Sequence, residues 1–193
     1  MGKYNGWQTR HVGLSIFLAA LAVLFACRPC TAQSPQVLLG KAAPPFVIES
    51  GDGKRLTLDA LAGKVAVIFY ETRETSQKNG DIKDRLNKLY DRQDERLRQS
   101  IARVPVFNCS KLFWPVTLVW RESLKKHSRR VGMTLYGDWD GRMALNYHMK
   151  DRESNVLILD RSGTVRYAGS GRISEEQYAA MEELLDRLIN QEK

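Results

Sequence analysis

Cysteine is scarce in this chain of 193 residues: there are three, and two of them, Cys27 and Cys30, lie near the N-terminus. These two form a CxxC pattern directly after an apolar run. A CxxC motif that exchanges disulfides instead stands at the start of a helix that follows a buried strand, where the helix N-terminus lowers the pKa of the first thiol. Cys109 is then the one cysteine left in the rest of the chain, and a single cysteine forms no internal disulfide.

Long runs of like charge are also missing. The chain has 30 Lys and Arg against 22 Asp and Glu, and beyond the first 32 residues 27 bases remain, mixed in sign with the acids. Proteins that track nucleic-acid phosphates carry concentrated basic runs, so we do not expect a nucleic-acid partner. The densest basic stretch, residues 125–130, is interpreted as a solvated helix face. Metal-ligand spacings and phosphate-binding glycine loops are absent as well, so no metal or other cofactor is expected.

The N-terminus is short and basic, and an uncharged apolar run follows at residues 12–26. As a helix this run rises about 22 Å, which is short of the ~30 Å hydrocarbon core of a bilayer. The pattern predicts a secretory signal over residues 1–32 and a periplasmic or secreted protein. Cleavage after Ala32 fits the small residues before it. Alternatively, residues 24–27 resemble a lipobox, in which case Cys27 carries lipid and anchors the protein to a membrane.

The apolar pattern predicts one α/β domain over residues 42–193, after a connector at residues 33–41. A continuous apolar, β-branched run at residues 65–70 is typical of a central strand that is covered on both faces. Shorter runs indicate further strands at residues 46–48, 56–58, 104–108, 134–136, 156–159 and 164–168.

Apolar residues at spacings of three and four predict helices between these strands. The first helix is expected to begin with Ser76 as its cap and to end near Asp94. A second covers about residues 114–130, and the last opens with a capping box of Ser174 and Gln177. This order of strands and helices predicts a mixed central sheet with helices on both faces.

Several local motifs resemble those of the thioredoxin-like superfamily, in its redoxin, AhpC-TSA and TlpA-like branches. Residues 40–46, GKAAPPF, are similar to the opening G-x-x-A-P-x-F, and residues 61–69, LAGKVAVIF, to the strand motif L-x-G-K-x-x-V-x-F. Residues 138–147 resemble D-x-x-G-x-x-A-x-x-Y, and residues 157–163 resemble F-L-I-D-x-x-G. The resemblance covers about residues 40–188 and implies a thioredoxin-like fold, with a link to cell redox homeostasis.

The sequence departs from this superfamily where the superfamily's chemistry resides. Glu74 and Gln77 occupy the two cysteine positions of W-C-x-x-C. Neither a carboxylate nor an amide exchanges with a disulfide, because that reaction needs a thiolate. Ser154, followed by Asn155, stands where the fold carries a cis-proline. We expect a trans peptide there, since a non-proline cis bond costs ~3 kcal/mol.

Among thioredoxin-like proteins without the cysteine pair, the sequence is most similar to the periplasmic YtfJ-type family. Three short matches carry this resemblance: Thr75-Ser76-x-Lys78, Glu153-Ser154 before the late strand, and the final Ser-x-Glu helix. The resemblance implies an exported protein with a degenerate active site and an undefined biochemical role.

Three functional hypotheses follow from this sequence, and all of them stay open. In the first, the protein is non-catalytic and its groove binds a periplasmic protein, a peptide or a small ligand. The groove residues would be Glu71, Arg73, Glu74, Thr75 and Ser76, with Ser154 and Asn155 on the far wall. Helix capping and dipole compensation alone would also explain the acidic residues and Ser76 at this place.

In the second, Cys109 is the catalytic residue of a single-cysteine thiol oxidoreductase or peroxidase, and Lys111 lowers its pKa. The competing interpretation is an inert, partly buried thiol. A third hypothesis makes Glu71 or Glu74 the general base of a hydrolytic reaction. The tryptophans at positions 114, 120 and 139 are expected in the core or in the groove wall.

Overall fold

The computed structural model describes residues 34–190. The predicted signal segment, its two processing sites, Cys27 and Cys30 lie outside the described residues. In the part of the chain that is described, no helix has both the length and the apolarity that a bilayer crossing requires.

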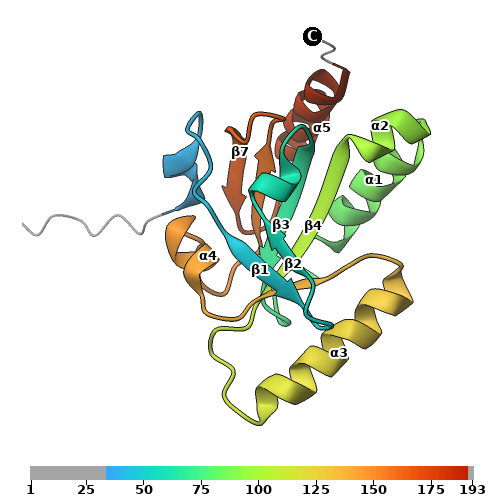
Figure 1. Ribbon diagram of the computed structural model, residues 1–193. Coiled ribbons are helices and arrows are strands. Elements are labelled where there is room, and N and C mark those ends of the chain that lie inside the picture. Colours follow the sequence, from blue (N-terminus) through green and yellow to red (C-terminus); the bar gives the residue numbers. More distant parts are fainter. Residues whose placement is uncertain (1–33, 191–193) are drawn as a thin grey trace, which may run out of the picture. The chain divides into compact units, whose positions relative to one another are not determined.

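A sheet of seven strands forms the centre of the described domain. Its strands are β1 (Val47–Ser50), β2 (Arg55–Thr57), β3 (Val65–Glu71), β4 (Ile101–Asn108), β5 (Tyr136–Asp138), β6 (Asn155–Leu159) and β7 (Val165–Ser170). Their spatial order is β2-β1-β5-β4-β3-β6-β7 (Figure 1). Strands β3, β4 and β5 are parallel, whereas β6 is antiparallel to β3 and β1 is antiparallel to β5. The mixed sheet predicted from the sequence is confirmed.

Helices cover both faces of this sheet. They are the short 3₁₀ turns η1 (Pro35–Leu38) and η2 (Asp59–Leu61) and the helices α1 (Gly80–Asp91), α2 (Glu95–Gln99), α3 (Val116–Val131), α4 (Arg142–Asn146) and α5 (Glu175–Asn190). Apolar residues of α1 and α5 form one core layer, and those of α4 and η1 belong to the layer on the opposite face. Helix α3 contacts β1.

Strand β3 separates the two core layers. All of its residues are buried, as the continuous apolar run predicts. Val65, Val67 and Phe69 pack with α1 and α5, and the residues between them pack on the other face. The described residues thus contain a seven-stranded sheet with an apolar layer on each face. The expected connector, residues 33–41, includes η1, which packs on β7.

The helix predicted from Ser76 to Asp94 is shorter at both ends, and these bounds of the prediction are wrong. Helix α1 begins at Gly80, and residues before it form turns. Asp94 is the N-cap of the separate helix α2, where its side chain accepts a hydrogen bond from the backbone N–H of Leu97 at 2.8 Å. The predicted capping box is confirmed, because Ser174 and Gln177 exchange hydrogen bonds of 2.9 and 3.2 Å.

Candidate functional site

Glu71 ends β3 with a buried side chain, at the place where the sequence resemblance puts a reactive loop. Its carboxylate forms a salt bridge of 2.9 Å with the Lys83 ammonium and accepts a 2.7 Å hydrogen bond from the Ser154 hydroxyl. Burial raises the pKa of Glu71, and these two partners offset part of that increase. Both partners of the carboxylate are therefore groups of the protein itself.

Asn79 joins this group to two further loops and is fully buried. Its side-chain amide donates to the Ser154 hydroxyl at 3.0 Å and to the Gly171 carbonyl at 2.9 Å. Its carbonyl oxygen accepts from the Ile173 backbone N–H at 2.9 Å. Glu71, Lys83, Asn79 and Ser154 thus form one buried polar network, which fills the junction of β3, α1 and the start of β6.

The turn between β3 and α1 is held by its own hydroxyl groups. The backbone N–H of Thr72 donates to the Thr75 hydroxyl at 2.8 Å, and Thr75 is buried. The Ser76 hydroxyl donates to the Arg73 carbonyl at 2.8 Å, so Ser76 does not cap α1 as the sequence predicted. Local side-chain bonds of this kind compete with the helix for the same backbone groups, which explains its late start.

The side chain of Asn155 is also held by internal hydrogen bonds. Its amide group donates to the Lys150 carbonyl at 3.0 Å, and its oxygen accepts from the Ser170 hydroxyl at 2.7 Å. It lines a separate cavity of about 350 Å³ beside Tyr70 and Thr72. In the described chain the cis peptide bond is Trp114–Pro115, and the bond before Ser154 is trans, as expected.

Cys109 is buried at the end of β4, and its thiol accepts a hydrogen bond of 3.1 Å from the Trp120 indole N–H. Burial raises the pKa of this thiol to about 12. Glu74 is exposed, and its pKa is lowered, first by a hydrogen bond from Thr72. Neither observation strengthens the catalytic hypotheses for these residues.

A cleft of about 690 Å³, here called the basic cleft, lies between α1 and α3 above β4. Its cationic and titratable lining residues are Glu71, Arg73, Lys83, Arg103, His127 and Arg130, and Ser76 and Trp120 also line it. Three of the predicted groove residues, Glu71, Arg73 and Ser76, are therefore brought together. Thr75, Ser154 and Asn155 belong to the buried contacts described above, and Glu74 does not line the cleft.

Three arginines of the basic cleft form no salt bridge with a described carboxylate, although the charge of Arg73 contributes to the lowered pKa of Glu74. Within residues 34–190 no carboxylate forms a salt bridge with the guanidinium of Arg73, Arg103 or Arg130. Arg103 donates to Asn87 at 2.9 Å, Arg130 contacts His127, and Arg73 lies 6.0 Å from the Trp120 ring centre. Burial and the nearby Arg130 lower the pKa of His127.

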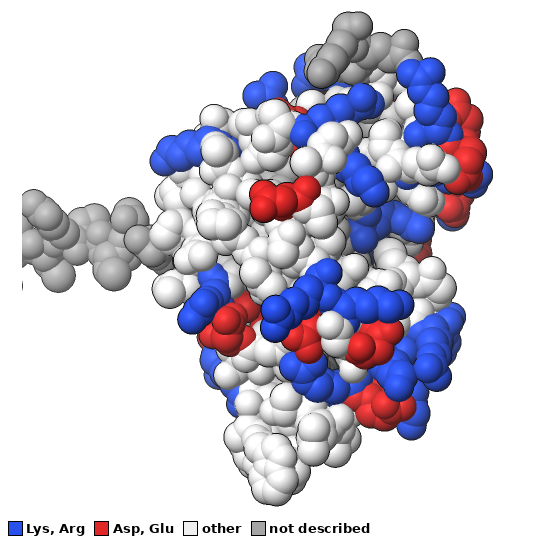
Figure 2. All heavy atoms as spheres, in the orientation of Figure 1, with Lys and Arg blue, Asp and Glu red and all other residues white. Residues whose placement is uncertain are grey.

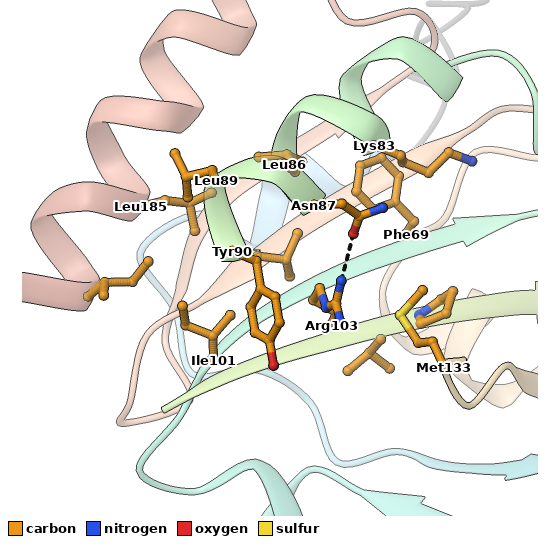
Figure 3. A pocket seen from close by; sticks show the side chains of 14 residues that line it. Phe69, Lys83, Leu86, Asn87, Leu89, Tyr90, Ile101, Arg103, Met133 and Leu185 are labelled. Atoms are coloured by element: carbon orange, nitrogen blue, oxygen red, sulfur yellow. Dashed lines mark hydrogen bonds between the residues drawn. The ribbon is translucent and has the colours of Figure 1, made fainter. Parts of the chain in front are cut away.

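An apolar cavity of about 80 Å³ adjoins the basic cleft (Figure 3). Arg103 reaches from β4 toward Asn87 on α1, and Tyr90 lies beside it with its ring centre 3.8 Å from the guanidinium carbon. The two cavities share Lys83, Asn87, Arg103, Pro105 and Met133 as lining residues. A polar surface and an apolar surface therefore meet at Arg103.

Sequence reasoning missed Arg103, His127 and Arg130 as cleft residues. Residues 125–130 were interpreted as a solvated face, yet two of them line the cleft. The alternation of β4 places Arg103 on the same sheet face as Ile101 and Pro105. That alternation is visible in the sequence, but it does not reveal which helix lies opposite.

The buried carboxyl of Glu71 makes stability depend on pH. Its pKa is raised from 4.5 in the folded protein, so the folded state binds more protons than the unfolded state just above that pH. The free energy of unfolding should then fall as pH rises through this range. We expect Glu71→Gln to lack this decline when urea unfolding is measured from acidic to neutral pH. A wild-type minus variant difference that stays constant with pH would contradict this assignment.

Comparisons with known proteins place this geometry in a wider group. No protein-family model matches the chain, and no curated protein matches it either. Several solved structures do match the chain. A proposed protein disulfide isomerase from Bacteroides thetaiotaomicron superposes with a TM-score of 0.61 at 19% identity, over 79% of this chain and 91% of that one. A proposed thiol:disulfide interchange protein DsbE from Chlorobium tepidum gives 0.58 at 17% identity, over 79% and 98%.

The fold is thioredoxin-like. A third structure agrees: an uncharacterized conserved protein from Geobacillus kaustophilus superposes with a TM-score of 0.58 at 20% identity, over 78% of this chain and 82% of that one. At such identities the likeness concerns the fold alone. The thioredoxin-like fold predicted from the sequence is confirmed, and the closer YtfJ-type resemblance stays a prediction.

Proposed function

We propose that this chain is an exported thioredoxin-like protein that does not exchange disulfides and instead binds a carboxylate- or phosphate-bearing ligand, or an acidic peptide segment, in the basic cleft. The observation that carries the proposal is the group of Arg73, Arg103 and Arg130, which line one cavity and form no salt bridge within the described residues. Export and a periplasmic location rest on the N-terminal sequence, and lipid anchoring through Cys27 is the alternative form of that prediction.

Charge balance favours an anion in this cleft. Guanidinium groups that share a cavity repel one another, and their attraction to an anion is stronger there than in open water. The one carboxylate of the lining, Glu71, is already paired with Lys83. A volume of about 690 Å³ also lies within the usual range of small-molecule sites.

The adjoining apolar cavity indicates that the ligand has an apolar part next to its charge. Leu86, Leu89 and Ile101 line this cavity, and Arg103 stands where it meets the basic cleft. A short acyl carboxylate such as octanoate matches this arrangement, with its carboxylate near Arg103 and its chain in the apolar cavity. Octanoate is the probe we choose for the test.

Isothermal titration calorimetry with octanoate tests the proposal. The protein used is the form of the chain that begins at Gln33. We expect saturable binding, and we expect Arg103→Gln or Arg130→Gln to weaken it by about tenfold, because each removes a charge-assisted hydrogen bond of roughly 1.5–3 kcal/mol. Arg142→Gln is the matched control, since Arg142 is 83% exposed on α4 and pairs with Asp140 outside the cleft.

Octyltrimethylammonium separates charge recognition from apolar binding. It has the same chain length and the opposite charge, so we expect no saturable binding. Equal binding of the cation and the anion, or an equal loss in Arg142→Gln, would overturn the proposal.

A further inference from the structure

Five large apolar side chains are exposed around the start of α3. They are Phe113, Trp114, Val116, Leu118 and Val119, here called the apolar tip. Phe113 is 70% exposed and Trp114 77%, so the prediction that Trp114 lies in the core or the groove wall is wrong. Helix α3 begins at the bottom of Figure 1, and the same region of Figure 2 is an uncharged projection.

The concentration of these side chains is unusual for a surface in water. Other exposed apolar residues of the described chain are spread over η1, β1, α4 and the end of α3. The tip places five within seven consecutive positions. Contiguous apolar patches of this kind mark sites that contact another protein or a membrane.

The apolar tip is a projection and not a groove, which argues against a partner that binds by fitting into a groove. None of its five residues lines the basic cleft, the apolar cavity or the cavity beside Asn155. With side-chain areas of roughly 150–250 Å² for aromatic residues, the whole tip exposes on the order of 600 Å². A stable dimer buries about 800 Å² per partner, so a second copy would need surface beyond the tip.

The charges next to the tip complement an anionic surface. Helix α3 continues from it with Arg121, Lys125, Lys126, Arg129 and Arg130, and Glu122 is its one acid. At 1.5 Å per residue, Lys126 lies about 10 Å from Val119 along the helix, which is close to the Debye length at 0.1 M salt. Lys126 and Arg129 are exposed.

We propose that the apolar tip inserts into the interface of an anionic phospholipid bilayer while Lys126 and Arg129 of α3 lie against its headgroups. Trp and Phe favour the boundary between headgroups and acyl chains, and basic residues beside them add attraction to anionic lipid. Arg130 lines the basic cleft, but the tip, Lys126 and Arg129 do not, so variants at these positions leave the lining of the proposed ligand site unchanged.

Cosedimentation with vesicles tests this, using the chain that begins at Gln33 so that the N-terminal apolar run does not contribute. The described residues hold the seven-stranded sheet and both apolar layers, and thermal unfolding by circular dichroism verifies that this form folds. We expect the bound fraction on vesicles with about a third phosphatidylglycerol to exceed that on pure phosphatidylcholine by about tenfold, and to fall with salt.

Phe113→Ser/Trp114→Ser should reduce this partitioning by about tenfold, and Lys126→Gln/Arg129→Gln should reduce its dependence on phosphatidylglycerol. Leu145→Ser is the control, because Leu145 is 74% exposed on α4, outside the tip. Absence of vesicle binding, or an equal loss in the Leu145 variant, would overturn the proposal. So would a dimer in light scattering that the Phe113/Trp114 variant dissolves, since that result assigns the tip to a second copy.

Discussion

Replacement of Asn79 by alanine is expected to lower the free energy of unfolding by about 3 kcal/mol. The side chain is fully buried and makes three hydrogen bonds, to Ser154, Gly171 and Ile173. The variant leaves the Gly171 carbonyl and the Ile173 N–H without these partners. An unsatisfied buried group costs roughly 1–3 kcal/mol, so two such groups account for the expected loss.

Urea unfolding measures this change directly, and the thermal midpoint should fall by roughly 6–12 °C for a domain of this size. Asn146→Ala provides the control, because Asn146 is exposed at the end of α4 and we expect only a small effect there. Similar losses in the two variants would show that the buried network contributes no more to the free energy of unfolding than an exposed side chain does.

The Asn79 network occupies the junction of β3, α1 and β6 in this thioredoxin-like domain. The Ser154 hydroxyl, just before β6, donates to the Glu71 carboxylate at the end of β3 and accepts from the Asn79 amide at the start of α1. The polar groups of Asn79 and Ser154 bond to other parts of the protein, and Glu71 is paired with Lys83 where these two line the basic cleft. The network therefore holds the loops together at the edge of the proposed ligand site.

Local patterns made much of this fold predictable. The apolar run at residues 65–70 identifies the central strand because burial on both faces needs apolar residues at consecutive positions. Ser174 and Gln177 identify a helix start because the capping box is a contact between near neighbours. Such signals depend on a few consecutive residues, which a sequence displays directly.

The candidate site was harder to predict because its contacts join distant residues. Ser154 meets Glu71 across 83 positions, and Ile173 meets Asn79 across 94. The early helix start assigned to Ser76 failed for a related reason, since the competing bonds of the turn depend on its three-dimensional course. Arg103 and Arg130 likewise face one cavity only after β4 and α3 have packed.

Cys109 is expected to react with a thiol reagent at least about thirtyfold more slowly in the folded protein than in the chain unfolded by urea, because the loss of thiolate outweighs the greater nucleophilicity of a more basic thiolate. Burial is the main cause that raises its thiol pKa, from 9.0 to about 12. The Trp120 hydrogen bond lowers the pKa by a smaller amount, while the Asp138 charge raises it. Three units of pKa correspond to about a thousandfold less thiolate at neutral pH.

Absorbance with Ellman's reagent gives both rates when the protein begins at Gln33, so that Cys109 is its one thiol. A matched variant separates the burial of the thiol from the reagent's access to this loop. Cys109→Ser/Ser110→Cys moves the thiol one position, to an exposed residue, and should react at the rate of an ordinary thiol. A folded wild-type rate within about tenfold of the unfolded rate would restore the single-cysteine oxidoreductase or peroxidase as a candidate. The expected slow rate removes it, because peroxide reduction and mixed-disulfide formation both begin with attack by a thiolate. The ligand binding that we propose for the basic cleft is then supported together by the buried thiol, the internal partners of the Glu71 carboxylate and the three arginines without salt bridges.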